Sequence, residues 1–224
     1  MPTVLVIGAS RGIGLEFARQ YVADGARVIA TARDDRGAAQ LRELGAKPLR
    51  LDALDEAQVA GFGEQLKGES LDLAVYCAGV YGPRTTALAA PGGLDFDAVM
   101  HTNVRAPMQL MPQLAPLLAP TAGKLAVITS SMGSISRMSS TSGWLYRVSK
   151  AAANAALRCA SLELGPQGIV CIAFHPGWVR TAMGGAGADV DAATSVTGMR
   201  CVLAAANASQ NGKFLNYKGE QLAW

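Results

Sequence analysis

Short apolar runs alternate with longer helix-like stretches along the chain. The runs at 3–8 (TVLVIG) and 71–77 (LDLAVYC) are almost continuously apolar, as expected for parallel strands that are covered on both faces. The predicted strands are 3–8, 27–32, 47–51, 71–77, 124–130, 168–174 and a short 213–217. The predicted helices are 12–24, 35–45, 55–67, 95–118, 143–164 and 191–207.

Repeated strand–helix–strand order predicts right-handed crossovers, because such connections close back onto a sheet in one hand only. The fold class is therefore α/β, with a Rossmann-type doubly wound parallel sheet and helices on both faces. No composition break, linker or internal repeat divides the 224 residues. We expect one domain over 1–224, a length that buries a large core.

Composition excludes several classes of function. The net charge is +3, from 20 Lys and Arg against 17 Asp and Glu, and no basic run is present; we expect no nucleic-acid or membrane partner. The four cysteines are far apart in apolar surroundings, so we expect no metal site and no disulfide framework. With no basic leader and no run of 18 apolar residues, the chain is expected to be cytoplasmic.

Three glycines lie between the first predicted strand and the first predicted helix. Gly8, Gly12 and Gly14 follow VLVI and precede an amphipathic stretch. A strand that turns tightly into a helix brings backbone amides close to a pyrophosphate at the helix N-terminus. Glycine permits that approach because it has no Cβ and tolerates positive φ. The sequence therefore predicts a dinucleotide site.

The end of the second strand indicates which dinucleotide is preferred. An acidic residue there would bind the adenosine ribose, whereas arginine accommodates a 2′-phosphate. The strand ends at Ala32, followed by Arg33, and Arg11 supplies a second guanidinium. NADP(H) is the predicted cofactor. Asp34 and Asp35 weaken this slightly, although they are as well placed to cap the next helix.

Asp52, after the third strand, has two possible roles. Its carboxylate could accept a hydrogen bond from the adenine amino group, or it could cap the helix that begins near Asp55.

A Tyr and a Lys lie four positions apart at the head of an alanine-rich stretch. Residues i and i+4 share a helix face, but Tyr146 and Lys150 alone could be ordinary surface side chains. Ser130 and Ser131 follow the fifth strand. Ligands bind at the carboxyl ends of parallel strands, so a serine there and the Tyr146–Lys150 face would converge on one crevice.

With these residues together, the chain resembles a classical short-chain dehydrogenase/reductase over almost its whole length. The motifs occur in the family's order: Gly8-x-x-x-Gly12-x-Gly14, Asn103, Ser131, Tyr146-x-x-x-Lys150 and HPGWVRT at 175–181. ATARD, the long SSMGSISRMSSTSG loop and HPGWVRTAMGG are similar to the C-factor-like branch, which includes the sniffer-type carbonyl reductases.

The resemblance implies a role for each catalytic residue. Tyr146 would protonate the carbonyl oxygen, and Lys150 would lower the pKa of Tyr146 and hold the nicotinamide ribose. Ser131 would donate a hydrogen bond to the oxygen as charge develops on it. Asn103 would anchor a water in a proton relay. The implied cofactor-binding residues are Gly8, Ser10, Arg11, Gly12, Ile13, Gly14, Arg33, Asp52, Ala78, Gly79, Tyr146, Lys150, Pro176, Gly177, Val179 and Thr181.

The chain departs from the family's pattern in two places. Tyr76 and Cys77 stand where two asparagines are common, which leaves the bracing of the central strands open. The loop between the serine and the tyrosine is about two residues longer than usual, so Ser130 and Ser134 are alternatives to Ser131. His175, between a strand and the Pro176 turn, is interpreted as structural.

The substrate is expected to be an apolar carbonyl or alcohol compound with no charged anchor. The predicted pocket residues are Met132, Ile135, Met138, Trp144, Trp178 and Met183. A short covering segment at 183–191 is expected to be mobile. The resemblance implies a homodimer or homotetramer. An NADP-binding regulatory protein with little turnover is the alternative; an epimerase of the extended relatives would need a further substrate domain.

Overall fold

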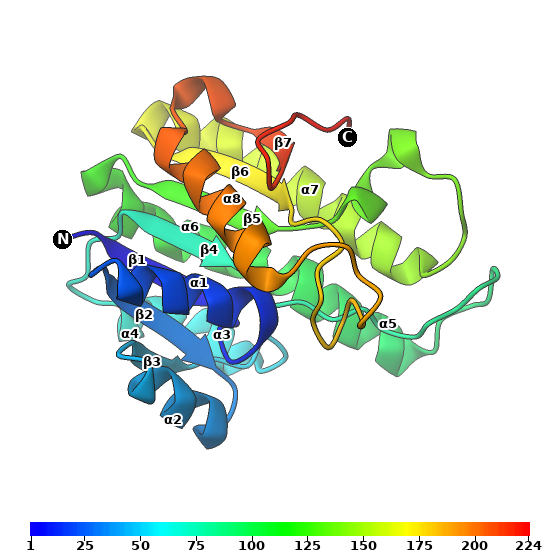
Figure 1. Cartoon of the computed structure of the whole chain (residues 1–224), viewed down its shortest axis with the longest axis horizontal. Helices are drawn as coiled ribbons and strands as arrows, with labels where there is room; N and C mark the ends of the chain where they lie inside the picture. Colours follow the sequence, from blue (N-terminus) through cyan, green and yellow to red (C-terminus); the bar gives the residue numbers. More distant parts are fainter.

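Seven parallel strands form the centre of the computed structural model, which describes residues 1–224 (Figure 1). Their order is β3-β2-β1-β4-β5-β6-β7, so the chain reverses its direction of travel between β1 and β4. Such a switch point opens a crevice at the carboxyl ends of the strands. The strands are β1 Thr3–Ile7, β2 Arg27–Ala32, β3 Lys47–Arg50, β4 Leu73–Tyr76, β5 Lys124–Ile128, β6 Val170–His175 and β7 Lys213–Asn216. The predicted fold class is confirmed.

The helices agree with the predicted ones except in two places. The helices are α1 Gly12–Ala23, α2 Asp35–Glu43, α3 Glu56–Ala60, α4 Phe62–Gln65, α5 Gly93–Met100, α6 Ala106–Leu118, α7 Trp144–Leu164 and α8 Ala192–Ala205. The predicted helix 55–67 is divided at Gly61 into α3 and α4. The predicted helix 95–118 changes to π-helical bonding over His101–Arg105.

Alternation along the strands produces two cores, one on each face of the sheet. In β1, Val4 and Val6 belong to a buried cluster with side chains from α1, α2 and α8. Leu5 and Ile7 belong to a second cluster with side chains from α3, α4, α6 and α7. Successive strand side chains point to opposite faces, so a strand with two buried faces must be apolar where it is buried, as β1 is from Val4 to Ile7.

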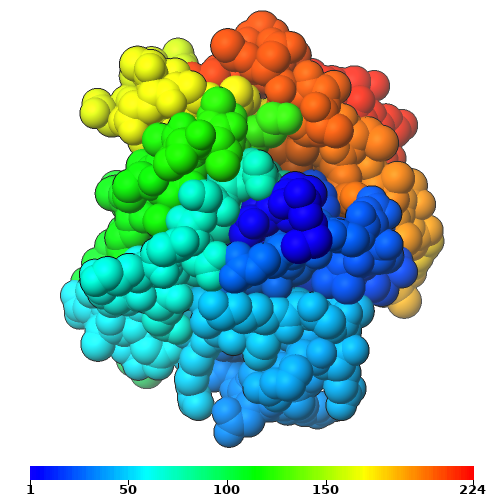
Figure 2. All heavy atoms as spheres, turned by 90° about the vertical axis from the view of Figure 1, so that its left-hand side faces the viewer, coloured from blue at the N-terminus to red at the C-terminus, as the bar shows by residue number.

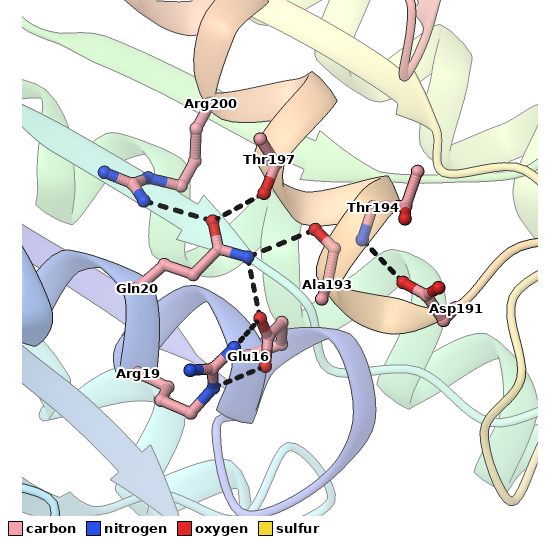
Figure 3. Close-up of polar contacts among 8 residues, drawn as sticks. All are labelled: Glu16, Arg19, Gln20, Asp191, Ala193, Thr194, Thr197 and Arg200. Carbon is pink, nitrogen blue, oxygen red and sulfur yellow. Dashed lines mark hydrogen bonds and ion pairs between the residues drawn. The ribbon is translucent and has the colours of Figure 1, made fainter.

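Helices α1 and α8 are joined by a polar network (Figure 3). The amide of Gln20 in α1 donates to the carbonyl of Ala193 at 3.1 Å and accepts from Arg200 of α8 at 3.1 Å. Asp191 caps α8 by accepting from the backbone N–H of Thr194 at 2.7 Å. These bonds fix the start of α8, and with it the end of the segment 183–191.

The two ends of the sheet differ. The strands begin at the end shown in Figure 2, where the N-terminal residues, in dark blue, lie between orange and cyan segments. The segments 80–92, 131–143 and 177–191 gather at the opposite end (Figure 1).

The C-terminal Trp224 stacks on Phe214 at 5.4 Å between ring centres, and its carbonyl accepts from the backbone N–H of Ser136 at 3.1 Å.

None of the helices combines the length and the apolar character needed to cross a membrane. No three His, Cys, Asp or Glu side chains gather in a way that could hold a metal ion. All four cysteines are free thiols.

Candidate active site

A cavity of about 620 Å³ opens at the carboxyl ends of the strands, within the usual size range of ligand sites. Residues that follow β1, β2, β3, β4, β5 and β6 line it. Every residue predicted to bind the cofactor lies in this lining: Gly8, Ser10, Arg11, Gly12, Ile13, Gly14, Arg33, Asp52, Ala78, Gly79, Tyr146, Lys150, Pro176, Gly177, Val179 and Thr181. Of the four residues predicted to be catalytic, Tyr146 and Lys150 are in the lining, whereas Ser131 and Asn103 are not.

The loop between β1 and α1 is packed so closely that it requires glycine. A Cβ on Gly8, whose φ is +82°, would lie 2.6 Å from the backbone nitrogen of Ala78. A Cβ on Gly14 would lie 2.2 Å from the carbonyl oxygen of Gly8. The backbone N–H of Gly8 donates to the buried hydroxyl of Thr31 at 2.9 Å. The loop is therefore held against β2 and β4 with its backbone facing the cavity.

The N-terminus of α1 suits an anion. Arg11 occupies the N-cap position with extended backbone and makes no side-chain cap bond, and the first turn contains no acidic residue. The first N–H groups of a helix lack partners within the helix and carry partial positive charge. These groups and the glycine loop fit the pyrophosphate of a dinucleotide.

Two guanidinium groups without an ion-pair partner lie in the wall of the same cavity. Arg11 and Arg33 are exposed, line the cavity, and neither belongs to one of the protein's ion pairs. The acids that follow Arg33 are engaged elsewhere: Asp34 caps α2 through the N–H of Gly37 at 2.7 Å, and Asp35 pairs with Arg50 at 3.5 Å. The arginines fit a phosphate on the adenosine ribose.

Asp52 does not cap the helix α3, because Asp55 occupies the N-cap position and accepts from the backbone N–H of Gln58 at 3.0 Å. The Asp52 carboxylate accepts from the backbone N–H of Leu54 at 3.0 Å, as a turn-capping residue does. Asp52 also lines the cavity.

Tyr146 and Lys150 share one face of α7, because this helix begins at Trp144. The Lys150 ammonium lies 5.6 Å from the centre of the Tyr146 ring and donates to the carbonyl of Ile128 at the end of β5 at 3.0 Å. The two residues are only 7% and 5% exposed. The surface interpretation of the pair is thereby excluded.

Burial sets the protonation of both groups. It lowers the pKa of Lys150 to about 8, with Cys77 acting in the opposite direction. It raises the pKa of Tyr146; a side-chain hydrogen bond with Ser130 acts in the opposite direction, and Tyr81 adds to the increase. Lys150 is not among the causes of this shift in the cofactor-free protein, and its expected effect on the pKa of Tyr146 stays a prediction. The phenol is neutral at pH 7, the form that donates a proton.

The structure places Ser130, and not Ser131, at the cavity. Ser130 has extended backbone, and with Ile128 and Thr129 it lines the cavity. Ser131 begins the 3₁₀ turn Ser131–Gly133, of which only Met132 lines the cavity. Ser134 is fully buried, and its hydroxyl donates to the carbonyl of Ala223 at 2.6 Å. The serine predicted at 131 is therefore corrected to Ser130, one of the two alternatives.

Asn103 lies behind the cavity. Its side chain accepts from the N–H of Val80 at 2.9 Å, and donates to the carbonyl of Val80 at 2.8 Å and to the hydroxyl of Ser149 at 2.9 Å. Asn103 thus joins the end of β4 to α7. Pro107, four residues on, has no N–H to donate to the Asn103 carbonyl. This leaves the main chain of Asn103 as the candidate water ligand.

Tyr76 braces the central strands where the family commonly has an asparagine. Its hydroxyl donates to the carbonyl of Thr102 at 2.7 Å in a buried contact, so β4 is tied to the π-helical turn that carries Asn103. Burial raises the pKa of Tyr76, which keeps this donor protonated. Cys77 lines the cavity, and burial raises the pKa of its thiol as well.

Two residues in the wall, Tyr81 and Arg84, were not predicted. The ring of Tyr81 stacks on that of Tyr146 at 4.6 Å between centres. The Arg84 guanidinium lies 4.8 Å from the centre of the Tyr81 ring and donates to the carbonyl of Met183 at 2.7 Å. Their position soon after β4, at the carboxyl edge of the sheet, was the available signal. A survey of aromatic and charged residues after each strand would have found them.

The predicted substrate pocket is half correct. Met132, Trp178 and Met183 line the cavity, whereas Ile135, Met138 and Trp144 do not. Ile135 and Met138 follow the 3₁₀ turn Ser131–Gly133 and are exposed, and the indole N–H of Trp144 donates to the carbonyl of Ala89 at 3.0 Å.

The segment 183–191 is tied down at several points. The backbone N–H of Arg180 donates to the carbonyl of Val190 at 2.8 Å, and the indole N–H of Trp178 donates to the carbonyl of Gly184 at 2.9 Å. These bonds tie the segment to the residues that follow β6, and its expected mobility stays a prediction.

His175 is outside the cavity lining. Its buried Nδ1 has no hydrogen-bond partner. Burial, followed by the nearby charge of Arg137, lowers the pKa of His175 to about 4. A neutral imidazole with a buried Nδ1 agrees with the structural interpretation.

Comparisons with known proteins extend these observations. The family model described as short chain dehydrogenase matches residues 2–190. The C-signal protein of Myxococcus xanthus is 35% identical over 158 residues, which are 69% of this chain and 93% of that protein. The structure is similar to the carbonyl reductase Sniffer of D. melanogaster, with a TM-score of 0.92, 28% identity and 100% of both chains covered. It is also similar to an NADPH-bound carbonyl reductase from chicken fatty liver, with a TM-score of 0.88, 33% identity and coverage of 100% of this chain and 99% of that one.

Proposed function

The chain belongs to the short-chain dehydrogenase/reductase family and is an NADP(H)-dependent oxidoreductase, and on that premise we propose that it reduces a carbonyl compound with Tyr146 as the proton donor. The observation that carries the proposal is the convergence of Tyr146, Lys150 and Ser130 in one cavity with the glycine loop. NADPH, when bound, supplies the hydride. The chain's own residues hold the cofactor and move the proton.

Each catalytic side chain has one task. Tyr146, kept neutral by burial, donates its phenolic proton to the substrate oxygen. Ser130 donates a hydrogen bond to that oxygen as negative charge develops on it, a contribution that is largest in a site shielded from water. Lys150 is held by the Ile128 carbonyl, and its positive charge stabilises the phenolate that remains.

The remaining residues bind the cofactor and position the catalytic side chains. The glycine loop and the first turn of α1 hold the pyrophosphate, and Arg11 and Arg33 hold the 2′-phosphate. Pro176, Gly177, Val179 and Thr181 line the cavity together with Ala78 and Gly79, and these residues would bind the nicotinamide half of the cofactor. Asn103 fixes the end of β4 against α7 and offers its carbonyl to a relay water.

Organisation and location complete the proposal. The chain acts as one catalytic domain over 1–224, with 183–191 as its substrate segment and a small molecule as its partner, without nucleic acid or membrane. It forms a homodimer or homotetramer; exposed apolar side chains on α6 and α7, such as Met108 and Leu162, which are 54% and 63% exposed, support this. Four free thiols fit a cytoplasmic location.

Turnover tests the proposal directly. Purified protein with NADPH or NADH is given aldehydes, ketones, quinones and α-dicarbonyls, and the loss of cofactor absorbance is followed. NADPH is expected to be preferred, and Tyr146→Phe to lower kcat by about 10²–10⁴-fold while NADPH binding is retained. Tyr217→Phe is the matched control, since Tyr217 lies outside the cavity lining.

Two results of this assay would contradict the proposed function. Tight NADPH binding without turnover of any carbonyl compound would favour an NADP-binding regulatory protein over a reductase. The similarity to the C-signal protein is the reason for considering that function. Equal turnover by Tyr146→Phe would remove the proton-transfer role.

A further inference from the structure

Arg84 is a cation without an anion in the wall of the cavity. It is exposed and belongs to no ion pair. Its one hydrogen bond goes to the carbonyl of Met183, and its guanidinium lies over the ring of Tyr81. A guanidinium has five N–H donors, so most of its hydrogen-bonding capacity is open to a ligand.

The charges around the cavity leave Arg84 uncompensated. Asp52 is the only acidic residue in the lining, and it follows β3, beyond the glycine loop. Arg11 and Arg33 also lie on that side, where the adenosine phosphate is proposed to bind. Arg84 follows β4 and contacts the segment beyond β6, so it faces the substrate portion of the cavity.

Stacking fixes the position of Arg84 relative to the catalytic phenol. Tyr81 lies between them, 4.6 Å from the Tyr146 ring centre and 4.8 Å from the Arg84 guanidinium carbon. A substrate whose carbonyl oxygen meets Tyr146 would therefore pass along Tyr81 before it reaches the guanidinium. The apolar side chains of Met132, Trp178 and Met183 also line the cavity.

We propose that Arg84 anchors an anionic group of the substrate. The favoured substrates are aldehydes or ketones with an apolar body and a carboxylate several bonds from the carbonyl. Arginine matches this group because its planar fork can bind both carboxylate oxygens. The inference rests on the proposed reductase function, and it replaces the sequence-based expectation of a substrate with no charged anchor.

A pair of substrates of equal shape isolates the charge. 4-Formylbenzoate and 4-formylbenzamide differ by one negative charge, and kcat/KM is measured for both with NADPH. The parent is expected to favour the carboxylate about tenfold to a hundredfold, the range for a hydrogen bond to a charged group. Arg84→Gln is expected to bring the ratio close to one, and Arg84→Glu to favour the amide. Added salt should reduce the parent's preference.

The control removes the same charge elsewhere. Arg42 on α2 is exposed and outside the cavity lining, so Arg42→Gln should keep the parent's ratio. Circular dichroism and NADPH titration show that each variant is folded and binds cofactor.

The outcomes separate the two proposals. An equal fall of kcat/KM for both substrates in Arg84→Gln would show that Arg84 merely holds the Met183 segment, and would overturn the anchor. Equal reduction of both substrates by the parent would also overturn it, while the reductase function stands. Failure to reduce either one, or any carbonyl, despite bound NADPH would overturn the proposed function and the anchor together.

Discussion

At the residue scale, two adjacent serines after β5 occupy different environments. Ser130 lines the cavity and Ser131 does not. We expect Ser130→Ala to lower kcat by about 10²–10³-fold, because a hydrogen bond to the developing oxyanion is lost. Ser131→Ala should change kcat less than about threefold, within the usual context dependence of such effects. Steady-state kinetics with saturating NADPH measures both.

The two variants serve as controls for each other, since each removes one hydroxyl. A loss of activity confined to Ser131→Ala would return the oxyanion role to the residue predicted from sequence. NADPH binding by fluorescence distinguishes a chemical defect from a loss of cofactor.

Lys150 makes stability depend on pH. Its pKa falls from the ordinary 10.5 to about 8 on burial, so the unfolded chain binds more protons between these pH values. The stability of the parent therefore rises with pH across this window. In cofactor-free protein, Lys150→Met should raise the free energy of unfolding at pH 7 by about 1–2 kcal/mol, the desolvation cost less one hydrogen bond.

Urea unfolding at several pH values measures this difference. The gain should be full well below pH 8, fall to zero between pH 8 and 10.5, and reverse above 10.5, because Lys150 is then neutral in both states and only its lost hydrogen bond remains. A variant less stable than the parent at pH 7, or a gain independent of pH, contradicts the argument. Turnover should be lost in either case.

At the scale of elements, the turn from β1 into α1 depends on Gly14. Its Cβ would meet the Gly8 carbonyl oxygen at 2.2 Å, so Gly14→Ala must displace the glycine loop. We expect a loss of about 2–3 kcal/mol in the free energy of unfolding and weaker NADPH binding. Thermal unfolding with and without NADPH measures both effects.

Gly93 supplies the matched control. It begins α5, and a Cβ there would meet nothing within 4 Å. Gly93→Ala should be neutral or stabilise by up to about 1 kcal/mol, because alanine has the higher helix propensity. Equal effects of the two substitutions would show that the packing at Gly14 does not matter.

The elements also show where sequence-based prediction succeeds. All seven strands were predicted. Apolar runs found the central ones because a strand buried on both faces has few polar positions, whereas the edge strand β3 has a charged residue at each end and no buried residue. The π-helical turn at His101–Arg105 was missed, because i→i+5 bonding leaves no periodic signature over five residues. Gly61 ended α3 early, a break that hydrophobic periodicity does not reveal.

At the scale of the whole molecule, the fold brings together residues that are distant in the chain. Resemblance and topology predicted the cofactor side of the cavity, because its loops follow strand ends that the pattern locates. The choice of Ser130 over Ser131 was not predictable, since it depends on the residue at which the chain leaves β5. Tyr81 and Arg84 were missed because the stacking of Tyr81 on Tyr146, and of Arg84 on Tyr81, depends on how the loop after β4 packs against α7.

The two chain ends offer very different points of attachment. The N-terminus lies where the strands begin, at the end opposite the cavity. The C-terminal residues bind the segment that follows Ser130, through the bonds from Ser134 and Ser136 to Ala223 and Trp224. An enzyme immobilised on a bead or an electrode through its first residues therefore keeps its cavity accessible from solution. A tether at Trp224 would instead strain the segment next to Ser130, the proposed oxyanion donor.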